Sequence, residues 1–361
     1  MPGFENDLST VPFDRAESTL VRRVDEVPNF ELVGKIGGSR FGDVWLARER
    51  LTGVSRAIKF LDKRERRLAE IDLAGVRHIQ QAAHDHPHLL PILAVGETEN
   101  CFHYVMEAAD SEPPGRDGLR RPSTLRATLQ RVGRFGASEA LTLVQKLASG
   151  VAHLHAQGLT HNDLKPENIL FVRGEPKIAD VGLARPKDGQ TGAGTRGYMA
   201  PDGPDDVYAL GRILYELQSG LALSEFPRLT PEAYERPAAE VAAALRIIDK
   251  ACRPRRADRF GGASELLTAI ERELRTLRSR MARRRRLIVA GICCAAAIPL
   301  TWASWMLFRP VPQIALRQSG EIYTALRIPS YTVIPRRLHP SGSLKVPLIT
   351  SFAPQATTMS L

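Results

Sequence analysis

Cysteine is scarce in this chain of 361 residues, and its few positions exclude a cysteine metal site and a disulfide-rich secreted domain. The four cysteines are Cys101, Cys252, Cys293 and Cys294. No pair has metal-ligand spacing, and they do not form the disulfide framework of a small secreted domain. The N-terminus also lacks a basic start followed by an apolar run, so we expect no cleavable signal peptide. A reducing compartment fits this composition best.

Long hydrophobic runs are equally rare, and one stands out near the C-terminus. Leu287–Phe308 holds 22 residues without a charge, and a helix of that length would reach roughly 33 Å, enough to cross a bilayer. The twenty residues before it contain eight Arg, against three in the twenty that follow. Because positive charge gathers on the cytoplasmic side, we expect a single-pass protein of the cell membrane, with the chain before residue 287 in the cytoplasm and the tail 309–361 outside the cytoplasm.

The net charge of +10 lies almost entirely around this run. Residues 272–286 carry +7 and residues 309–361 carry +5, which leaves −2 for all other residues. A basic stretch beside an apolar span is typical of a topology signal, so no nucleic-acid partner is expected. The sequence instead predicts a nearly neutral main domain followed by a basic juxtamembrane segment at 276–286.

The main domain divides into two parts of different periodicity. Residues 1–29 show no periodicity and are interpreted as a flexible leader. From Phe30, alternation of apolar and polar residues predicts five strands, at 30–38, 41–49, 55–61, 91–95 and 101–106, with one helix at 64–83. After a linker rich in Pro, Gly and charge (110–123), spacings of three and four predict helices at 137–157, 206–219, 238–252 and 262–278.

Four short motifs occur along these two parts. In order, they are I-G-G-S-R-F-G-D-V (36–44), R-A-I-K (56–59), H-N-D-L-K-P-E-N (161–168) and I-A-D-V-G-L-A (178–184). The glycines of the first, between two strands, let backbone N–H groups approach phosphates. The third motif is the most specific, because His, Asp, Lys and Asn at these spacings have no structural reason to recur together.

Through these motifs the sequence resembles the bacterial eukaryotic-like (Hanks-type) serine/threonine protein kinases over about residues 30–280. The resemblance implies an α+β, two-lobed kinase domain at 30–275, with a five-stranded N-lobe carrying one helix (30–108) and a mostly helical C-lobe (109–275). One C-terminal transmembrane helix would follow. It also implies transfer of the ATP γ-phosphoryl group to Ser or Thr hydroxyls of proteins, with Mg²⁺. The partners are then ATP, protein substrates and the membrane, and self-association at the membrane is left open.

The resemblance also assigns roles to individual residues. Asp163 would accept or orient the proton of the substrate hydroxyl, and Lys165 would steady the γ-phosphate. Asn168 and Asp180 would bind magnesium. Thr195 would contact the catalytic Asp directly.

Lys59 would pair with the α- and β-phosphates, and it needs a carboxylate partner on the following helix. Glu70 is expected in that role, with Asp72 and Glu65 as open alternatives. The residues implied to contact the nucleotide are Ile36, Gly37, Gly38, Gly42, Val44, Ala57, Lys59, Met106, Glu107 and Ala109.

Several positions depart from the family pattern. Ser39, Asn162 and Val181 stand where the family usually has Gly, Arg and Phe. Asp202 replaces the Glu of A-P-E, with Arg259 as its expected ion-pair partner, and only three residues separate Asp202 from the start of the next helix. These departures support an alternative in which the chain is a pseudokinase, a membrane-bound nucleotide-binding scaffold without turnover.

Overall fold

The computed structural model describes residues 27–39, 42–84, 86–112, 121–180, 184–186, 194–228, 238–309, 313–318, 321–326 and 335–337. The chain divides into two compact units, residues 1–281 and 282–361, and each is described by itself. The expected leader is described only from Val27 onward, and Val181 lies outside the described residues.

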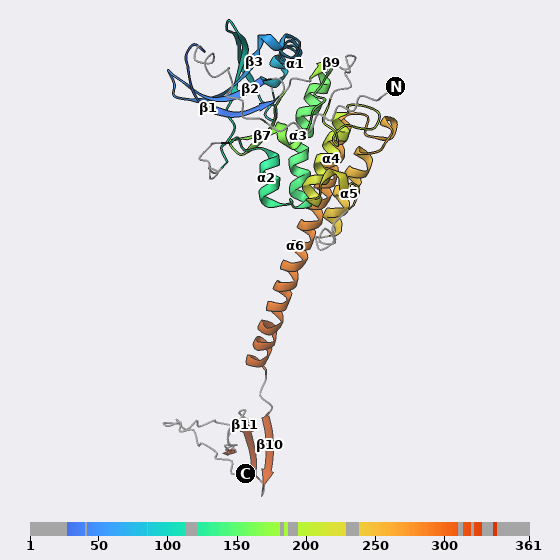
Figure 1. Cartoon of the computed structure of the whole chain (residues 1–361). Coiled ribbons are helices and arrows are strands. Elements are labelled where there is room, and N and C mark those ends of the chain that lie inside the picture. The colour runs from blue at the N-terminus through green and yellow to red at the C-terminus, as the bar shows by residue number, and fades with distance from the viewer. Residues whose placement is uncertain are drawn as a thin grey trace, which may run out of the picture. The chain divides into compact units, whose positions relative to one another are not determined.

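An antiparallel five-stranded sheet forms the N-terminal lobe (Figure 1). Its order is β1-β2-β3-β5-β4. The strands are β1 (Phe30–Ser39), β2 (Gly42–Glu49), β3 (Ser55–Asp62), β4 (Ile92–Glu97) and β5 (Cys101–Glu107). Helix α1 (Arg66–His84) connects β3 to β4 and contacts both strands. The prediction of five strands and one helix is confirmed.

The two-residue period of β3 decides which of its side chains face the interior of the domain. Ala57 and Leu61 belong to the large core that includes α1, whereas Ile58 and Phe60 belong to a second cluster on the other face. Lys59 lies between Ala57 and Leu61 in this alternation, so it points to the side of α1. A lysine is thereby placed in a buried face of the sheet.

Helices build the second lobe (Figure 1). They are α2 (Leu125–Val132), α3 (Ala137–Ala156), α4 (Asp206–Ser219) and α5 (Ala238–Ala251). Every residue of α4 is buried, so this helix is the centre of the lobe. The predictions for α3, α4 and α5 are confirmed. The sequence analysis missed α2, a helix of 8 residues that begins after Thr124, whose hydroxyl accepts a hydrogen bond from the backbone N–H of Ala127.

Four short strands bracket the loops that carry the third and fourth motifs. They are β6 (Leu159–Thr160), β7 (Ile169–Val172), β8 (Glu175–Ile178) and β9 (Arg185–Pro186). β6 pairs with β9, and β7 pairs with β8. The turn between β7 and β8 has positive φ at Arg173 and Gly174, as a two-residue hairpin turn requires. These pairings bring residues 161–168 close to Ala179, whose N–H donates to Asn168 O at 2.8 Å.

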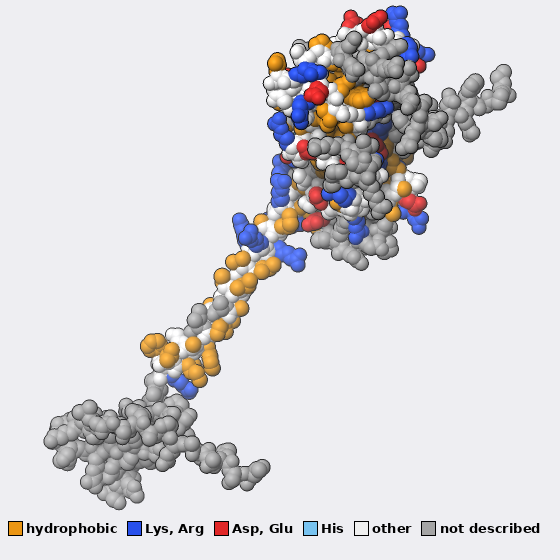
Figure 2. Space-filling model, turned by 60° about the vertical axis from the view of Figure 1, so that its left-hand side comes forward, with side chains coloured by type: hydrophobic (Ala, Val, Ile, Leu, Met, Phe, Trp, Pro, Cys, Tyr) orange, Lys and Arg blue, Asp and Glu red, His pale blue; other side chains and the backbone are white. Residues whose placement is uncertain are grey.

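Helix α6 (Ala263–Leu307) is continuous over the predicted helix 262–278, the basic segment and most of the apolar run. Its first part buries Leu266, Ile270 and Leu274, which are four residues apart and so share one face. Side chains described beyond Leu277 are exposed, and Figure 2 shows hydrophobic ones along the visible face of the apolar part. Of the described residues, this helix alone is long and apolar enough to cross a membrane, judged by length and composition.

The tail contains a small sheet that the sequence analysis did not predict. Its three antiparallel strands are β10 (Gln313–Gln318), β11 (Glu321–Leu326) and β12 (Pro335–Arg337). The order is β10-β11-β12, so each connection joins neighbouring strands.

Candidate active site

A cleft of about 760 Å³, counting the part open to solvent, is lined by both lobes. This volume lies in the range of small-molecule sites, roughly 300–1,000 Å³. The lining includes all the expected nucleotide contacts except Gly42, together with both expected metal ligands. The lining residues that the sequence analysis did not single out are Leu90, Tyr104, Pro122, Glu167, Leu170 and Ala179. They come from the segment before β4, from β5, the linker, the third motif, β7 and the segment before Asp180, which only the folded chain brings together.

Gly42 has a different reason to be glycine. Its φ is +148°, and a Cβ at this position would lie 1.9 Å from the carbonyl oxygen of Phe60 on β3. The glycine therefore allows β2 to approach β3 closely. Gly42 does not line the cleft, and its expected contact with the nucleotide stays a prediction.

Lys59 forms its ion pair on α1 with Asp72, and the prediction that Glu70 would be the partner is wrong. Lys59 Nζ lies 2.7 Å from Asp72 Oδ2, and the two residues are 4% and 0% exposed. Glu70 is exposed and pairs instead with Arg66, one helical turn earlier, at 2.8 Å. Two helical positions differ by about 200° around the axis, so Glu70 and Asp72 face opposite sides. Glu65, the other alternative, is exposed in the 3-10 turn before α1.

A signal for Asp72 was present in the sequence. The apolar residues of α1 that face the core are Ala69, Leu73, Val76 and Ile79. Position 72 is three residues after Ala69 and four before Val76, so it belongs to this buried face.

Asp180 contributes a second carboxylate to Lys59, at 3.0 Å. Burial lowers the pKa of Lys59, but Tyr104 and the carboxylates of Asp180 and Asp72 outweigh it and hold that pKa well above its usual value. Burial alone would raise the pKa of Asp180, and Lys59 more than reverses this effect. Asp180 has φ of +57°, a left-handed conformation that is uncommon outside glycine. The cleft therefore contains a charged lysine flanked by two carboxylates.

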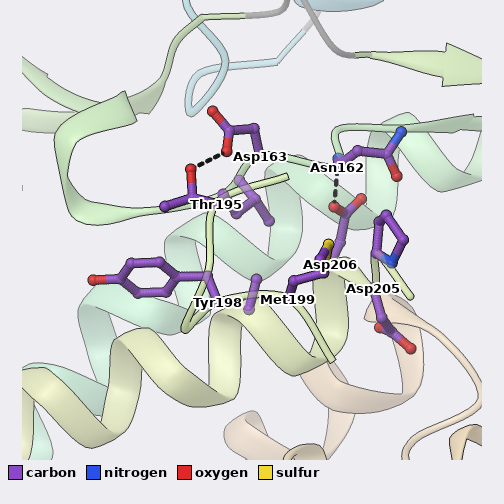
Figure 3. Close-up of a pocket in the computed structure, with 10 residues that line it drawn as sticks. Asn162, Asp163, Thr195, Tyr198, Met199, Asp205 and Asp206 are labelled. Carbon is purple, nitrogen blue, oxygen red and sulfur yellow. Dashed lines mark hydrogen bonds between the residues drawn. The ribbon is translucent and has the colours of Figure 1, made fainter. Parts of the chain in front are cut away.

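Three side chains surround the carboxylate of Asp163. Thr195 Oγ1 donates to Asp163 Oδ1 at 2.6 Å, and Lys165 Nζ donates to Oδ2 at 2.9 Å and to the Thr195 hydroxyl at 2.8 Å. Asn168 Nδ2 donates to the carbonyl oxygen and to Oδ2 of Asp163, at 2.8 and 3.1 Å. Figure 3 shows Thr195 directed at Asp163, and the contact expected for Thr195 is confirmed. Asp163 is thus held in a fixed orientation beside two donors that could face a substrate.

Asp206, the first residue of α4, anchors the backbone before Asp163. Its two carboxylate oxygens accept from the N–H groups of His161, at 2.8 Å, and Asn162, at 2.9 Å. Figure 3 shows the second of these contacts. Oδ2 also lies 2.9 Å from His155 Nε2. Burial would raise the pKa of Asp206, but the hydrogen bond and charge of His155 and the contacts with His161 lower it overall. The anchor allows Asn162 to adopt φ of +66° immediately before Asp163.

The segment after the fourth motif is fixed to the second lobe by an ion pair. Arg259 Nη2 lies 2.6 Å from Asp202, as expected, and Nη1 lies 2.7 Å from Asp205.

A pocket of about 210 Å³, counting open space, lies next to this segment. Asp163, Thr195, Tyr198, Met199 and Asp205 are among its lining residues (Figure 3).

The side chains of Asn168 and Asp180 are suited to magnesium. The amide nitrogen of Asn168 is used by Asp163, which leaves its oxygen available. Carboxylate and amide oxygens are ligands that Mg²⁺ accepts, and this ion commonly takes its remaining ligands from phosphates and water. Within the described part of the chain, no group of three or more His, Cys, Asp or Glu side chains could hold a metal ion by itself.

The two-lobed fold, the interlobe cleft and the neighbouring Lys59, Asp163, Asn168 and Asp180 define a domain of the protein kinase class. The family model described as "Protein kinase domain" matches residues 30–269, so the chain belongs to the protein kinase family.

Curated relatives agree with this assignment. The chain is 33% identical over 218 residues to serine/threonine-protein kinase PEPKR2 of Arabidopsis thaliana, covering 56% of this chain and 43% of the relative. It is 32% identical over 205 residues to sperm motility kinase 2A of Mus musculus, covering 53% and 38%. It is 34% identical over 221 residues to putative cyclin-dependent kinase F-2 of Oryza sativa subsp. japonica, covering 54% and 63%. The chain thus spans less than two thirds of the length of each of these relatives.

Proposed function

We propose that this protein kinase transfers the ATP γ-phosphoryl group to Ser and Thr hydroxyls of proteins. The observation that carries the proposal is the arrangement around Asp163, whose carboxylate is held by Thr195, Lys165 and Asn168. A carboxylate fixed in this way can accept the hydrogen bond of a substrate hydroxyl and orient its oxygen for attack. Little covalent chemistry is required of the protein in such a transfer.

Each remaining charged residue has a place in this reaction. Lys59, held by Asp72, supplies positive charge toward the α- and β-phosphates, and Lys165 does the same toward the γ-phosphate. Asn168 and Asp180 would hold magnesium. When bound, the ion neutralises charge on the phosphate oxygens. The apolar side chains of Ile36, Val44, Ala57, Met106 and Leu170 would enclose the adenine.

Specificity for Ser and Thr has two supports. Lys165 lies two residues after Asp163, which is the form found in serine/threonine kinases, and it contacts Thr195 as well as Asp163. Several of the relatives that the chain resembles are named serine/threonine kinases.

We further propose that the protein is a single-pass protein of the cell membrane. The kinase domain would comprise residues 30–275, a basic juxtamembrane segment 276–286, a transmembrane helix 287–308 and an extracytoplasmic tail 309–361. The exposed apolar side chains of α6 and the excess of Arg before them support this order. Self-association at the membrane would bring two kinase domains together and is part of the proposal.

The alternative function, nucleotide binding without turnover, is supported by the departures from the family pattern, one of which is next to Asp163 in the chain. Asn162 replaces the usual Arg and carries no charge beside Asp163. Against it, Lys59, Asn168 and Asp180, which would contact phosphate and metal, line one cleft, and Lys165 lies beside Asp163. We therefore retain it only as an outcome of the test.

The test is phosphate transfer from labelled ATP to a generic basic protein by the full chain, solubilised in detergent. Hydrolysis of the product should release phosphoserine and phosphothreonine, and chelation of magnesium should stop the labelling. Labelling of tyrosine alone would refute the specificity. ATP binding without any labelling would favour the scaffold.

A further inference from the structure

A buried arginine in the second lobe has no part in the chemistry proposed so far. Arg212 lies on α4, where the helix is buried on all sides, and is 6% exposed. Removing a guanidinium from water is costly unless its donors are satisfied, and an apolar side chain would avoid that cost. Its contacts therefore indicate what the arginine does.

Arg212 binds two backbone carbonyls from two different loops. Its Nε donates to Gly197 O at 2.9 Å, and its Nη2 donates to Leu223 O at 2.7 Å. The guanidinium lies 4.3 Å from the centre of the Phe226 ring, which covers its face. No carboxylate in the described ranges forms an ion pair with it. Arg212 thus acts as a clamp between two loops.

The two loops also touch each other at the positions that Arg212 binds. Gly197 has φ of +89°, and a Cβ there would come within 3.0 Å of Leu223 Cδ1. A side chain at position 197 would crowd Leu223 and would have to adopt a strained φ, so the loop backbone lies close against the Leu223 side chain. Arg212 fixes both sides of this close contact.

Gly197 belongs to the segment that contacts Asp163. Two residues before it, Thr195 donates its hydroxyl to Asp163, and one residue after it, the Tyr198 hydroxyl donates to Glu216 Oε2 at 2.5 Å. Glu216 lies one helical turn after Arg212 on α4. The segment is therefore attached to one face of α4 by a carbonyl at Gly197 and by a hydroxyl at Tyr198.

The segment is held at two further points: Arg126 Nη2 donates to the Tyr198 hydroxyl at 2.7 Å, and Arg259 forms an ion pair with Asp202. Only three residues separate Asp202 from Asp206, the start of α4. A chain that short cannot form an element of its own to cover the loop. A side chain from α4 replaces that support.

We propose that Arg212 is a positioning residue for the protein-substrate side of the reaction, holding residues 194–203 so that Thr195 stays on Asp163. This inference rests on the proposed kinase function. The inference adds to that function that α4, through Arg212, sets the geometry of the loop that meets the protein substrate. The nucleotide cleft, which Arg212 does not line, is independent of the clamp.

Kinetics of the full chain test the proposal. Arg212→Met keeps the apolar stem and removes both donors. It should lower kcat/KM for a protein substrate by roughly tenfold or more, because a small displacement of a positioned group is enough for such a loss. The Kd of a non-hydrolysable ATP analogue with magnesium should change by less than about twofold, because the cleft is untouched. Arg212→Lys should recover part of the rate, since it keeps the charge and a donor.

The matched control is Arg246→Met on α5, which removes an exposed ion pair with Glu273 of α6. It should leave both quantities unchanged. An unchanged kcat/KM in Arg212→Met would overturn the proposal. So would a parallel loss of nucleotide affinity, because it would show a general structural role.

Hydrogen exchange supplies a readout that does not need activity. The N–H groups of Tyr198 and Gly203 donate within the segment, to Thr195 O and Ala200 O. In Arg212→Met they should exchange roughly tenfold faster than in the wild type, while α3 is unaffected. If Arg212→Met does not fold, Arg212→Lys is judged by the same two measurements. Unchanged exchange refutes the clamp even if no transfer is ever detected, whereas absent transfer in the wild type refutes the proposed function alone.

Discussion

Lys59 of β3 and Asp72 of α1 form an almost completely buried ion pair, with 2.7 Å between Nζ and Oδ2. Because the two charges lie on different elements, the pair ties the helix to the sheet at the wall of the cleft. Burial raises the pKa of Asp72, and Lys59 partly offsets that rise. The alignment of Lys59 in the cleft therefore depends on Asp72 and not on Glu70, the residue expected from the family pattern.

Asp72→Asn should strongly reduce phosphate transfer, because it leaves Lys59 without its partner on α1. Because a misplaced catalytic group can cost about a hundredfold, we expect a loss of roughly that size in kcat/KM. The broken buried pair should also lower stability by about 3–5 kcal/mol. Glu70→Gln is the matched control, two residues away on an exposed face. It should stay within about twofold of the wild type. A larger effect from Glu70 than from Asp72 would contradict the assignment.

Thr195→Ala removes the hydroxyl that donates to Asp163 and accepts from Lys165. The rate of transfer should fall by about ten- to a hundredfold, because both partners lose orientation. Thr195→Ser keeps the hydroxyl and should retain most of the rate. Thr268→Ala, at an exposed hydroxyl on α6, serves as the control and should have no effect. Equal rates for Thr195→Ala and Thr195→Ser would argue against the role of the hydroxyl.

The stability of the kinase domain should depend on pH through His86. Burial, followed by His153 and His88, lowers the pKa of His86 from 6.5 to about 4. The unfolded chain then binds a proton that the folded chain does not, so stability should be lost as the pH falls from about 6.5 toward about 4. His86→Asn keeps an acceptor for the N–H of His88 and cannot titrate. Its unfolding temperature should fall less steeply over this pH range, and identical slopes would count against the prediction.

The proposed membrane topology predicts which residues a protease can reach. Protease added to intact cells should remove at most the tail 309–361, because the excess of Arg before the apolar part of α6 retains the preceding chain in the cytoplasm. Permeabilised cells should lose the kinase domain as well. Digestion of the kinase domain in intact cells would be incompatible with this topology.

The sequence alone predicted the N-terminal sheet and the main helices, because their periodicities are long enough to read. Alternation over 30–61 identified three strands, and spacings of three and four identified α3 and α4. The motifs also placed Asp163, Asn168 and Asp180 in one site, because their spacing is specific.

The remaining features depend on contacts between distant segments. The strands β6 and β9 have two residues each, too few for any period. Glu70 was chosen because it precedes Leu73 and Ala74 in the manner of the family's helix, whereas the buried face of α1 decides in favour of Asp72. Arg212 gave no signal at all, since its partners Gly197 and Leu223 become neighbours only after folding.

The most direct test of the account compares the wild type with Asp163→Asn for transfer of labelled phosphate and for ATP binding. Asp163 contacts Thr195, Lys165 and Asn168 but does not line the cleft. The variant should retain less than about 1% of the wild-type rate, because a positioned base contributes about 10²- to 10⁴-fold. Its affinity for ATP with magnesium should remain within a few-fold of the wild type. Transfer at a rate close to that of the wild type would contradict the assignment of Asp163 and with it the mechanism.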